Sequence, residues 1–390
     1  MTNIILADTE EVRAQLLPLT FTRPISHIMV GIGTIAQKWQ RMLPGHYSYL
    51  TVGYLSEKFP LHTEHDNLII ASHILPTPEL VKSITTLNHG EALKLPDGTI
   101  AARRGDVTAD VNTFFVRDFP EMPRAITHLY DIFTANGETI RRDFADITAG
   151  RTSQSVSQSC TVIGDPSMIF IEPGATVEGA FLNTKSGPIY IGANAEVMEG
   201  SCLRGPIAIM DHVTVNMGTK IYSDTTIGNY CKVGGELNNV VMHPYSNKAH
   251  DGFLGNAVIG SWCNLGAGCV ASNLKNDYTE IKLWNYPTRR FMRTGLQFCG
   301  LIMGDHSKAG INTMFNTATV VGVGVNIHGT GFPRNFVASF TEGSVAGFAD
   351  VPPAKFFNIA RRVMARRGIE LTESDERLYT ALYEITETYK

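Results

Sequence analysis

Aliphatic residues recur at every sixth position through the middle of the chain. The longest run has eight members without a gap: Ile191, Val197, Leu203, Ile209, Val215, Ile221, Ile227 and Val233. An amphipathic helix repeats its apolar residues at three and four apart, and a half-buried strand at two apart, so this period requires another geometry. Hexapeptide coils of a parallel β-helix supply it, because each short strand points one aliphatic side chain into a narrow interior where successive coils stack.

The same spacing returns after two breaks. It is lost near Asn239, resumes from Phe253 to Ala271, is lost again, and resumes from Met303 to Ile327. We therefore predict one solenoid from about residue 156 to about residue 331, with two interruptions. A β-sandwich whose alternating strands mimic a period of six is the alternative, and three separate runs disfavour it.

The solenoid divides the chain into three predicted domains. Residues 1–150 precede it, residues 151–350 contain it, and residues 351–390 follow the Pro352-Pro353 pair as a C-terminal helical tail. The tail carries paired arginines, Arg361-Arg362 and Arg366-Arg367. Such runs usually form a solvated helix face, and a phosphate contact is the alternative.

The first domain alternates strand-like and helix-like segments. A strand is predicted at 4–6, a helix at 35–42, a strand at 67–71 and a helix that begins at Pro78. This alternation predicts an α/β, Rossmann-like domain with a doubly wound sheet. A connecting helix and a polar linker are expected from about Ile140 to Ser159.

Charge and cysteine usage narrow the possible partners. A formal net charge of −4 gives no overall basic field, so we expect no nucleic-acid partner. The first residues, MTNIILADTE, lack the features of a signal peptide, and no segment reaches the length of a membrane helix. We therefore expect a cytoplasmic protein without a membrane partner. The six cysteines lack Cys-x-x-Cys or zinc spacing, which predicts free thiols and no confident metal site.

The strongest candidate chemistry follows the first break. The segment reads KAHDGFLGNAVIG from Lys248 to Gly260, then NLGAG at 264–268 and SN at 272–273. An amino sugar is largely an ammonium near neutral pH and must lose a proton before it can attack a thioester, a task that suits a neutral imidazole. His250 is the candidate base, with His306 as a rival.

This segment resembles the acetyltransferase domain of the bacterial bifunctional enzymes that make UDP-N-acetylglucosamine. Those enzymes carry Lys-Ala-x-His, Leu-Gly-Asp-Ala, Asn-Ile-Gly-Ala-Gly and Cys-Asn motifs, and the resemblance implies that His250 is the general base. Substrate-binding side chains are expected at four positions: Lys248, Phe253, Asn264 and Asn273. Binding of CoA or of a phosphate is expected at three: Ala267, Lys275 and Arg334. The resemblance further implies a left-handed β-helix, a homotrimer with active sites between subunits, and acetyl-CoA as the acyl donor.

The segment also departs from that family, and its stretch from Lys248 to His250 is one residue shorter. Phe253 and Leu274 stand where the family has tyrosines, and the stretch from Ser272 to Gly300 has no counterpart. This stretch must loop outward, because a filled solenoid cannot accept it. It is basic, with Lys275, Lys282, Arg289, Arg290 and Arg293.

The first domain resembles sugar-phosphate nucleotidyltransferases. Arg13 and a Leu-Pro-Leu-Thr precede Thr22-Arg23-Pro24, much as an arginine and a Leu-Pro-Leu-Thr precede a Lys-Pro in that family. The family's glycine-rich phosphate loop is replaced by residues 6–10, which contain no glycine, and Ser72 stands where an aspartate would bind Mg²⁺. Either Asp8, Arg13 and Arg23 bind UTP with Mg²⁺ in altered roles, or the domain now serves binding or assembly.

Three functions compete. The leading hypothesis is CoA-dependent N-acetylation of an amino-sugar 1-phosphate, such as glucosamine-1-phosphate, joined to a domain that forms UDP-N-acetylglucosamine or a related nucleotide sugar. The second is a zinc hydrolyase on a β-helix trimer, in which His243, His250 and another histidine meet across a subunit boundary. The third is a non-catalytic regulatory protein that binds nucleotide sugars.

Overall fold

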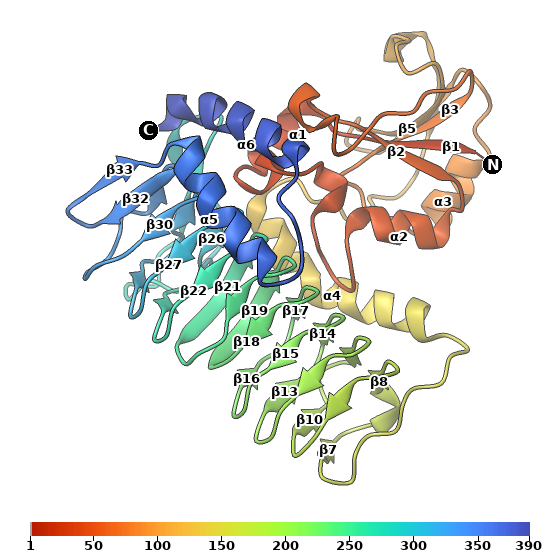
Figure 1. The fold of residues 1–390 in the computed structure, drawn as a ribbon. Helices are drawn as coiled ribbons and strands as arrows, with labels where there is room; N and C mark the ends of the chain where they lie inside the picture. The colour runs from red at the N-terminus through yellow and green to blue at the C-terminus, as the bar shows by residue number, and fades with distance from the viewer. Residues whose placement is uncertain (1) are drawn as a thin grey trace. The chain divides into compact units, whose positions relative to one another are not determined.

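The computed structural model describes residues 2–390, which form two compact units (Figure 1). The first comprises residues 2–28 and 33–131, and the second comprises residues 29–32 and 132–390. Among the described residues, no helix combines the length and apolar character needed to cross a membrane.

The first unit is a mixed α/β domain with a six-stranded sheet in the order β2-β1-β3-β5-β4-β6. Its strands are β1 (Asn3–Ala7), β2 (His46–Leu50), β3 (Asn67–Ala71), β4 (Glu91–Lys94), β5 (Ile100–Gly105) and β6 (Phe115–Asp118), and its helices are α1 (Glu10–Gln15), α2 (Ile35–Met42) and α3 (Pro78–Thr85). The predicted strands and helices coincide with β1, α2, β3 and α3. Strand β1 is parallel to β2 and β3, whereas β5 is antiparallel to β3 and β4, so the sheet is not doubly wound throughout.

The second unit is the predicted parallel β-helix, whose strands form three faces (Figure 1). The first face contains β7 (Thr161–Ile163), β10 (Phe181–Asn183), β13 (Cys202–Arg204), β16 (Lys220–Ile221), β23 (Val270–Ala271) and β28 (Met314–Phe315). The second contains β8 (Ile169–Ile171), β11 (Ile189–Ile191), β14 (Ile207–Ile209), β17 (Thr225–Ile227), β26 (Ile302–Met303), β29 (Val320–Val321) and β31 (Phe336–Val337). Strands β19 (Glu236–Met242) and β21 (Phe253–Ile259) bend across both of these faces.

The third face carries the groove described below. It contains β9 (Thr176–Val177), β12 (Glu196–Val197), β15 (Thr214–Val215), β18 (Lys232–Val233), β20 (Asn247–Lys248), β22 (Asn264–Leu265), β27 (Lys308–Ala309), β30 (Asn326–Ile327) and β32 (Thr341–Ser344). Strand β33 (Gly347–Asp350) pairs antiparallel with β32 and ends the sheet.

The period of six is the interior of this β-helix. All eight aliphatic side chains of the long run are at most 2% exposed and belong to one core. On the third face Val197 lies beside Val215, and Val215 beside Val233. Burying each such side chain stabilises the fold by about 1.5–3 kcal/mol.

The first break interrupts the period of six but not the stack of coils. Strand β19 turns a corner at Asn239, whose φ is +54°, and the coil continues with shortened corners. Leu254, which is beside Leu237, continues the interior column, whereas Phe253 is partly exposed. Expecting Phe253 in the column was wrong because the corner at Asn256 places the core residues Leu254 and Ile259 five positions apart instead of six.

The second break does leave the coil, as predicted. Residues 272–300 contain an antiparallel hairpin of β24 (Lys282–Asn285) and β25 (Arg290–Arg293). The coil resumes where Ile302 pairs with Val258 and Phe315 pairs with Ala271. The insertion therefore interrupts the period of six in the sequence, but the coils before and after it still stack directly on each other.

Helices flank the β-helix. Helix α4 (Leu129–Thr148) begins before the predicted connecting helix, and its Ile140 and Phe144 pack with Phe170 and Tyr190 of the coils. The predicted C-terminal tail consists of α5 (Pro353–Ala365) and α6 (Glu373–Thr386). The tail is held on the β-helix partly by Phe356, which packs edge-on against His306 of a coil corner.

Candidate functional site

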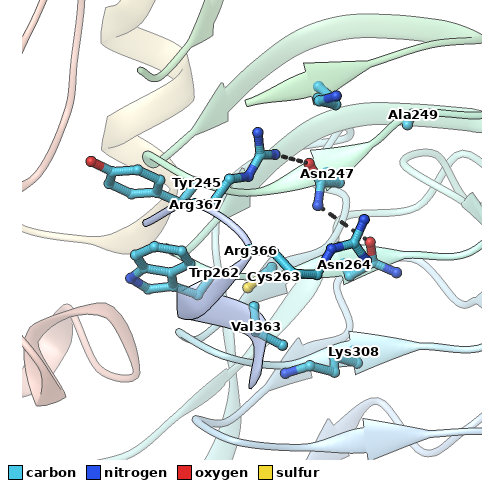
Figure 2. A pocket seen from close by; sticks show the side chains of 11 residues that line it. Tyr245, Asn247, Ala249, Trp262, Cys263, Asn264, Lys308, Val363, Arg366 and Arg367 are labelled. Atoms are coloured by element: carbon cyan, nitrogen blue, oxygen red, sulfur yellow. Dashed lines mark hydrogen bonds between the residues drawn. The ribbon is translucent and has the colours of Figure 1, made fainter. Parts of the chain in front are cut away.

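A groove of about 500 Å³ lies between the third face and the C-terminal segment (Figure 2). Its floor comes from four neighbouring coils, through β18, β20, β22 and β27, and its other wall comes from the end of α5. The lining residues are Lys232, Tyr245, Asn247, Ala249, Trp262, Cys263, Asn264, Lys308, Val363, Arg366 and Arg367. A cavity of this size accommodates a small molecule.

The groove is strongly cationic. Four of its lining side chains are basic and none is acidic: Lys232, Lys308, Arg366 and Arg367. Arg367 donates a hydrogen bond of 3.0 Å to Oδ1 of Asn247, and Nδ2 of Asn247 lies 3.4 Å from Oδ1 of Asn264 (Figure 2). Lys308 Nζ donates to the carbonyl oxygen of His306 at 2.8 Å. These neutral partners position the cations without neutralising them.

Tyr245 and Trp262 line one edge of the groove and belong to a ladder of stacked rings at a corner of the β-helix. The rings belong to His212, Tyr230, Tyr245, Trp262 and His306, with centroids 4.5, 5.0, 4.2 and 6.0 Å apart in that order. All five residues have φ between +57° and +66°, so the same left-handed turn recurs in each coil. Tyr245 and His306 cover the two faces of the Trp262 ring, which leaves only its edges toward the groove.

Burial lowers the pKa of Lys308 to about 8. The unfolded chain retains the ordinary lysine pKa near 10.5, so above about pH 8 the unfolded state binds more protons than the folded state. We expect this group to make the protein more stable as the pH rises from about 8 toward 10.5. Chemical denaturation at pH 8 and at pH 9 measures the change in the free energy of unfolding between these two pH values. On this rise in pH, Lys308→Met should gain less stability than wild type, or lose more. Identical pH dependence in the two proteins would contradict this assignment.

His250 lies at the corner that follows the third face, and it is exposed. Three hydrogen bonds hold the main chain of this corner. Asn216 Nδ2 donates to the carbonyl oxygen of Ala249 at 2.7 Å, Gly268 N–H donates to that of Asp251 at 3.0 Å, and Lys248 Nζ donates to that of His250. The imidazole therefore projects to solvent from a fixed backbone, as a general base requires.

Lys248 lies inside the β-helix instead of beside a substrate. Its side chain has no exposed area and takes the place of an aliphatic residue next to Val233 in the third column. Nζ donates to the carbonyl oxygens of Gly234, at 3.2 Å, and of His250. Burial lowers its pKa. A buried lysine therefore ties down the His250 corner, which makes it a supporting residue and not a surface contact.

The remaining predicted residues of the β-helix are dispersed. Asn264 is exposed in the groove, whereas Phe253 is half-buried on the first face. Asn273 lies at the corner between the first and second faces, where its Nδ2 donates to Oδ1 of Asn256 at 2.7 Å. Lys275 lies at the base of the insertion and donates to the carbonyl oxygen of Glu280 at 3.1 Å.

Ala267 and Arg334 lie in other coils or corners. The carbonyl oxygen of Ala267 accepts the N–H of Asn312 at 2.7 Å, and Arg334 is exposed in the connection between β30 and β31. A single chain thus places Ala249 of the His250 corner and Asn264 on one groove, but it does not bring Asn273, Lys275 or Arg334 to that groove.

The other histidines do not fit the zinc or rival-base hypotheses. His243 is fully buried; its Nε2 accepts the N–H of Met29 at 3.2 Å, and its Nδ1 lies 3.1 Å from the carbonyl oxygen of Ile259. Both ring nitrogens are therefore engaged away from His250. His306 is 2% exposed and packs against Trp262 and Tyr379, which keeps it from a surface-bound substrate. Within residues 2–390 no three metal-binding side chains gather.

In the first unit, the carboxylate of Asp8 follows β1 and is surrounded by donors. It accepts the N–H of Ile25 at 3.0 Å and the hydroxyls of Thr51 at 2.6 Å and Ser72 at 2.7 Å. Burial raises its pKa, against the opposing effect of these donors. Mg²⁺ prefers free carboxylate oxygens, so this saturated carboxylate beside a serine does not fit the metal.

The two arginines predicted for nucleotide binding are buried in the same unit. Arg13 donates to the hydroxyl of Tyr54 at 2.6 Å and to the carbonyl oxygen of Thr20, and it lies 4.0 Å from Asp8. Arg23 is 7% exposed. Asp8 and Arg13 thus belong to one internal network, which serves the packing of this unit.

Sequence reasoning missed Lys232, Asn247 and Lys308 as groove residues, because they come from separate coils that only the stacking brings together. The paired arginines of the tail were a usable signal. Arg366 and Arg367 line the groove, whereas Arg361 pairs with Glu376 of α6.

Residues 4–152 match a family model described as sugar nucleotidyl transferase. The chain is also similar to proteins named bifunctional protein GlmU. The one from Trichodesmium erythraeum is 26% identical over 140 residues, which is 35% of this chain and 25% of that protein. The one from Synechococcus elongatus is 24% identical over 213 residues, which is 51% of this chain and 42% of that protein. The chain thus spans well under half the length of these relatives.

Among solved structures, the chain is similar to AntD, an N-acyltransferase from Bacillus cereus. The sequence identity is 14%, the match covers 51% of this chain and 90% of that one, and the TM-score is 0.20.

Proposed function

From its GlmU-like relationship at the family level, we propose that the chain is a transferase of sugar-nucleotide biosynthesis whose β-helix acylates an amino sugar. The observation that carries this proposal is His250. It is exposed on a corner whose main chain is fixed by hydrogen bonds from Lys248, Asn216 and Gly268. An exposed imidazole on a rigid support is what proton abstraction from an amine needs.

The proposed reaction follows from that group. The neutral imidazole of His250 removes a proton from the sugar amine, and the nitrogen lone pair attacks the thioester carbonyl of an acyl-CoA. The tetrahedral intermediate then collapses, the C–S bond breaks, and the CoA sulfur leaves as a thiol after taking up a proton. Main-chain N–H groups of a neighbouring coil are suited to stabilise the oxyanion.

The proposal also specifies the acyl donor, the acceptor and the oligomeric state. Acetyl-CoA is the proposed donor, and a glucosamine-1-phosphate-like sugar is the proposed acceptor. His250 and Asn273 lie at different corners of one chain, so a site that uses both requires a neighbouring subunit. This requirement supports a homotrimer with active sites between subunits.

For the first unit we propose a binding or assembly role in place of nucleotidyl transfer. Asp8 has its carboxylate oxygens occupied by Ile25, Thr51 and Ser72, and the preceding turn lacks the glycines that cradle a triphosphate. No step through Mg²⁺ is proposed here.

A coupled assay tests both parts. The purified protein is incubated with acetyl-CoA, glucosamine-1-phosphate, UTP and Mg²⁺, and free thiol and pyrophosphate are followed separately. We expect thiol that depends on the amino sugar, without pyrophosphate. Absence of thiol would refute acetyl transfer to this acceptor, and pyrophosphate release would refute the proposed loss of nucleotidyl transfer.

A further inference from the structure

We propose that the groove on the third face, between the coils and the end of α5, is a binding site for a small molecule bearing a phosphate or diphosphate group. The proposal rests on the groove's own residues and does not depend on acyl transfer at His250.

The groove carries positive charge that no lining carboxylate compensates. This charge comes from Lys232, Lys308, Arg366 and Arg367, which all line the groove. Figure 2 labels the last three of these side chains. Some basic side chains elsewhere in the second unit have acidic partners, such as Glu376 for Arg361, whereas the groove lining contains no carboxylate. Bringing like charges together costs free energy, which a bound anion recovers.

The cations of the groove come from both the C-terminal segment and the coils. Arginines near the end of a helix are commonly explained by the helix dipole, which favours positive charge there. That explanation covers Arg366 and Arg367 but not the two lysines, because Lys232 and Lys308 project from β18 and β27. Two separate parts of the chain therefore supply positive charge to the same space.

One guanidinium of the groove is preorganised. Asn247 accepts a hydrogen bond from Arg367 and lies within 3.4 Å of Asn264, so one guanidinium is already oriented before a ligand arrives. A guanidinium offers several parallel N–H donors, which match the oxygens of a phosphate group.

The ladder of stacked rings restricts the kind of ligand further. Tyr245 and His306 cover both faces of the Trp262 ring, so no free ring face is offered to a planar base. Recognition in the groove therefore comes from charge and hydrogen bonding, which favours the phosphate part of a ligand over its base.

Calorimetric titration tests this site with defined probes: sodium pyrophosphate, inorganic phosphate and UDP. We expect saturable pyrophosphate binding by wild type, weakened about tenfold in Arg366→Gln, because one charge-assisted hydrogen bond is worth about 1.5 kcal/mol. The matched control is Arg362→Gln, an exposed arginine of the same helix that does not line the groove. It should bind as wild type does. Tighter binding of UDP than of inorganic phosphate would mark a diphosphate site, and the reverse a monophosphate site.

Two results would overturn the proposal. One is the absence of saturable binding of all three probes. The other is equal weakening in Arg366→Gln and Arg362→Gln, which would indicate a diffuse surface charge effect. Both arginines are exposed, so neither variant is expected to unfold, and matching thermal unfolding midpoints would verify this.

Discussion

Replacing His250 with alanine is expected to lower the rate of acyl transfer by about 10²–10⁴-fold, the usual contribution of a general base. The side chain is exposed, so its removal leaves no cavity. The corner itself is held through main-chain carbonyl groups, which alanine retains. Thiol release from acetyl-CoA measures the effect, and the thermal unfolding midpoint should stay at the wild-type value.

His328 provides a matched control. It is an exposed histidine that directly follows a strand of the third face, as the His250 corner does, but in a later coil. His328→Ala is expected to keep wild-type turnover. Equal rates in wild type and His250→Ala would remove His250 from the reaction, and equal losses in both variants would point to a general effect on the β-helix.

Truncating Phe315 to alanine is expected to destabilise the β-helix by about 3–5 kcal/mol, as for other buried phenylalanines. Its ring is 1% exposed in the main core and fills the interior beside Ala271, whose small side chain leaves room for it. Removing the ring would leave a cavity, because neither Ala271 nor the alanine introduced in place of Phe315 is large enough to fill the space. Chemical unfolding gives the change in free energy.

Phe332 is the control for the same truncation, because it is 50% exposed. Phe332→Ala should change stability by no more than about 0.5 kcal/mol. Similar losses for the two variants would mean that Phe315 does not fill the interior as described.

The fold was largely predictable because the period of six records a repeated physical requirement. Each strand between Ile191 and Val233 must place one aliphatic side chain inside. The prediction failed at Phe253 because the short corner at Asn256 changes the spacing between Leu254 and Ile259 without changing the stack. Lys248 was unpredictable for a related reason. Charged residues are rarely fully buried, and only the carbonyl groups of Gly234 and His250 make its interior position tolerable.

The candidate site was predicted only in part. His250 stood out through local sequence, and the structure places it on an exposed corner. The cationic groove depends on residues up to 135 positions apart, from Lys232 to Arg367, and their meeting follows from coil stacking and the return of α5. Neither spacing nor composition encodes such a contact directly.

The most direct test of acyl transfer is the identity of its product. Wild type and His250→Ala are incubated with acetyl-CoA and glucosamine-1-phosphate, and the sugar is examined by mass spectrometry. Our account predicts an N-acetylated sugar phosphate with wild type and at most a trace with the variant. An unmodified sugar with wild type, or equal acetylation by both proteins, would contradict it.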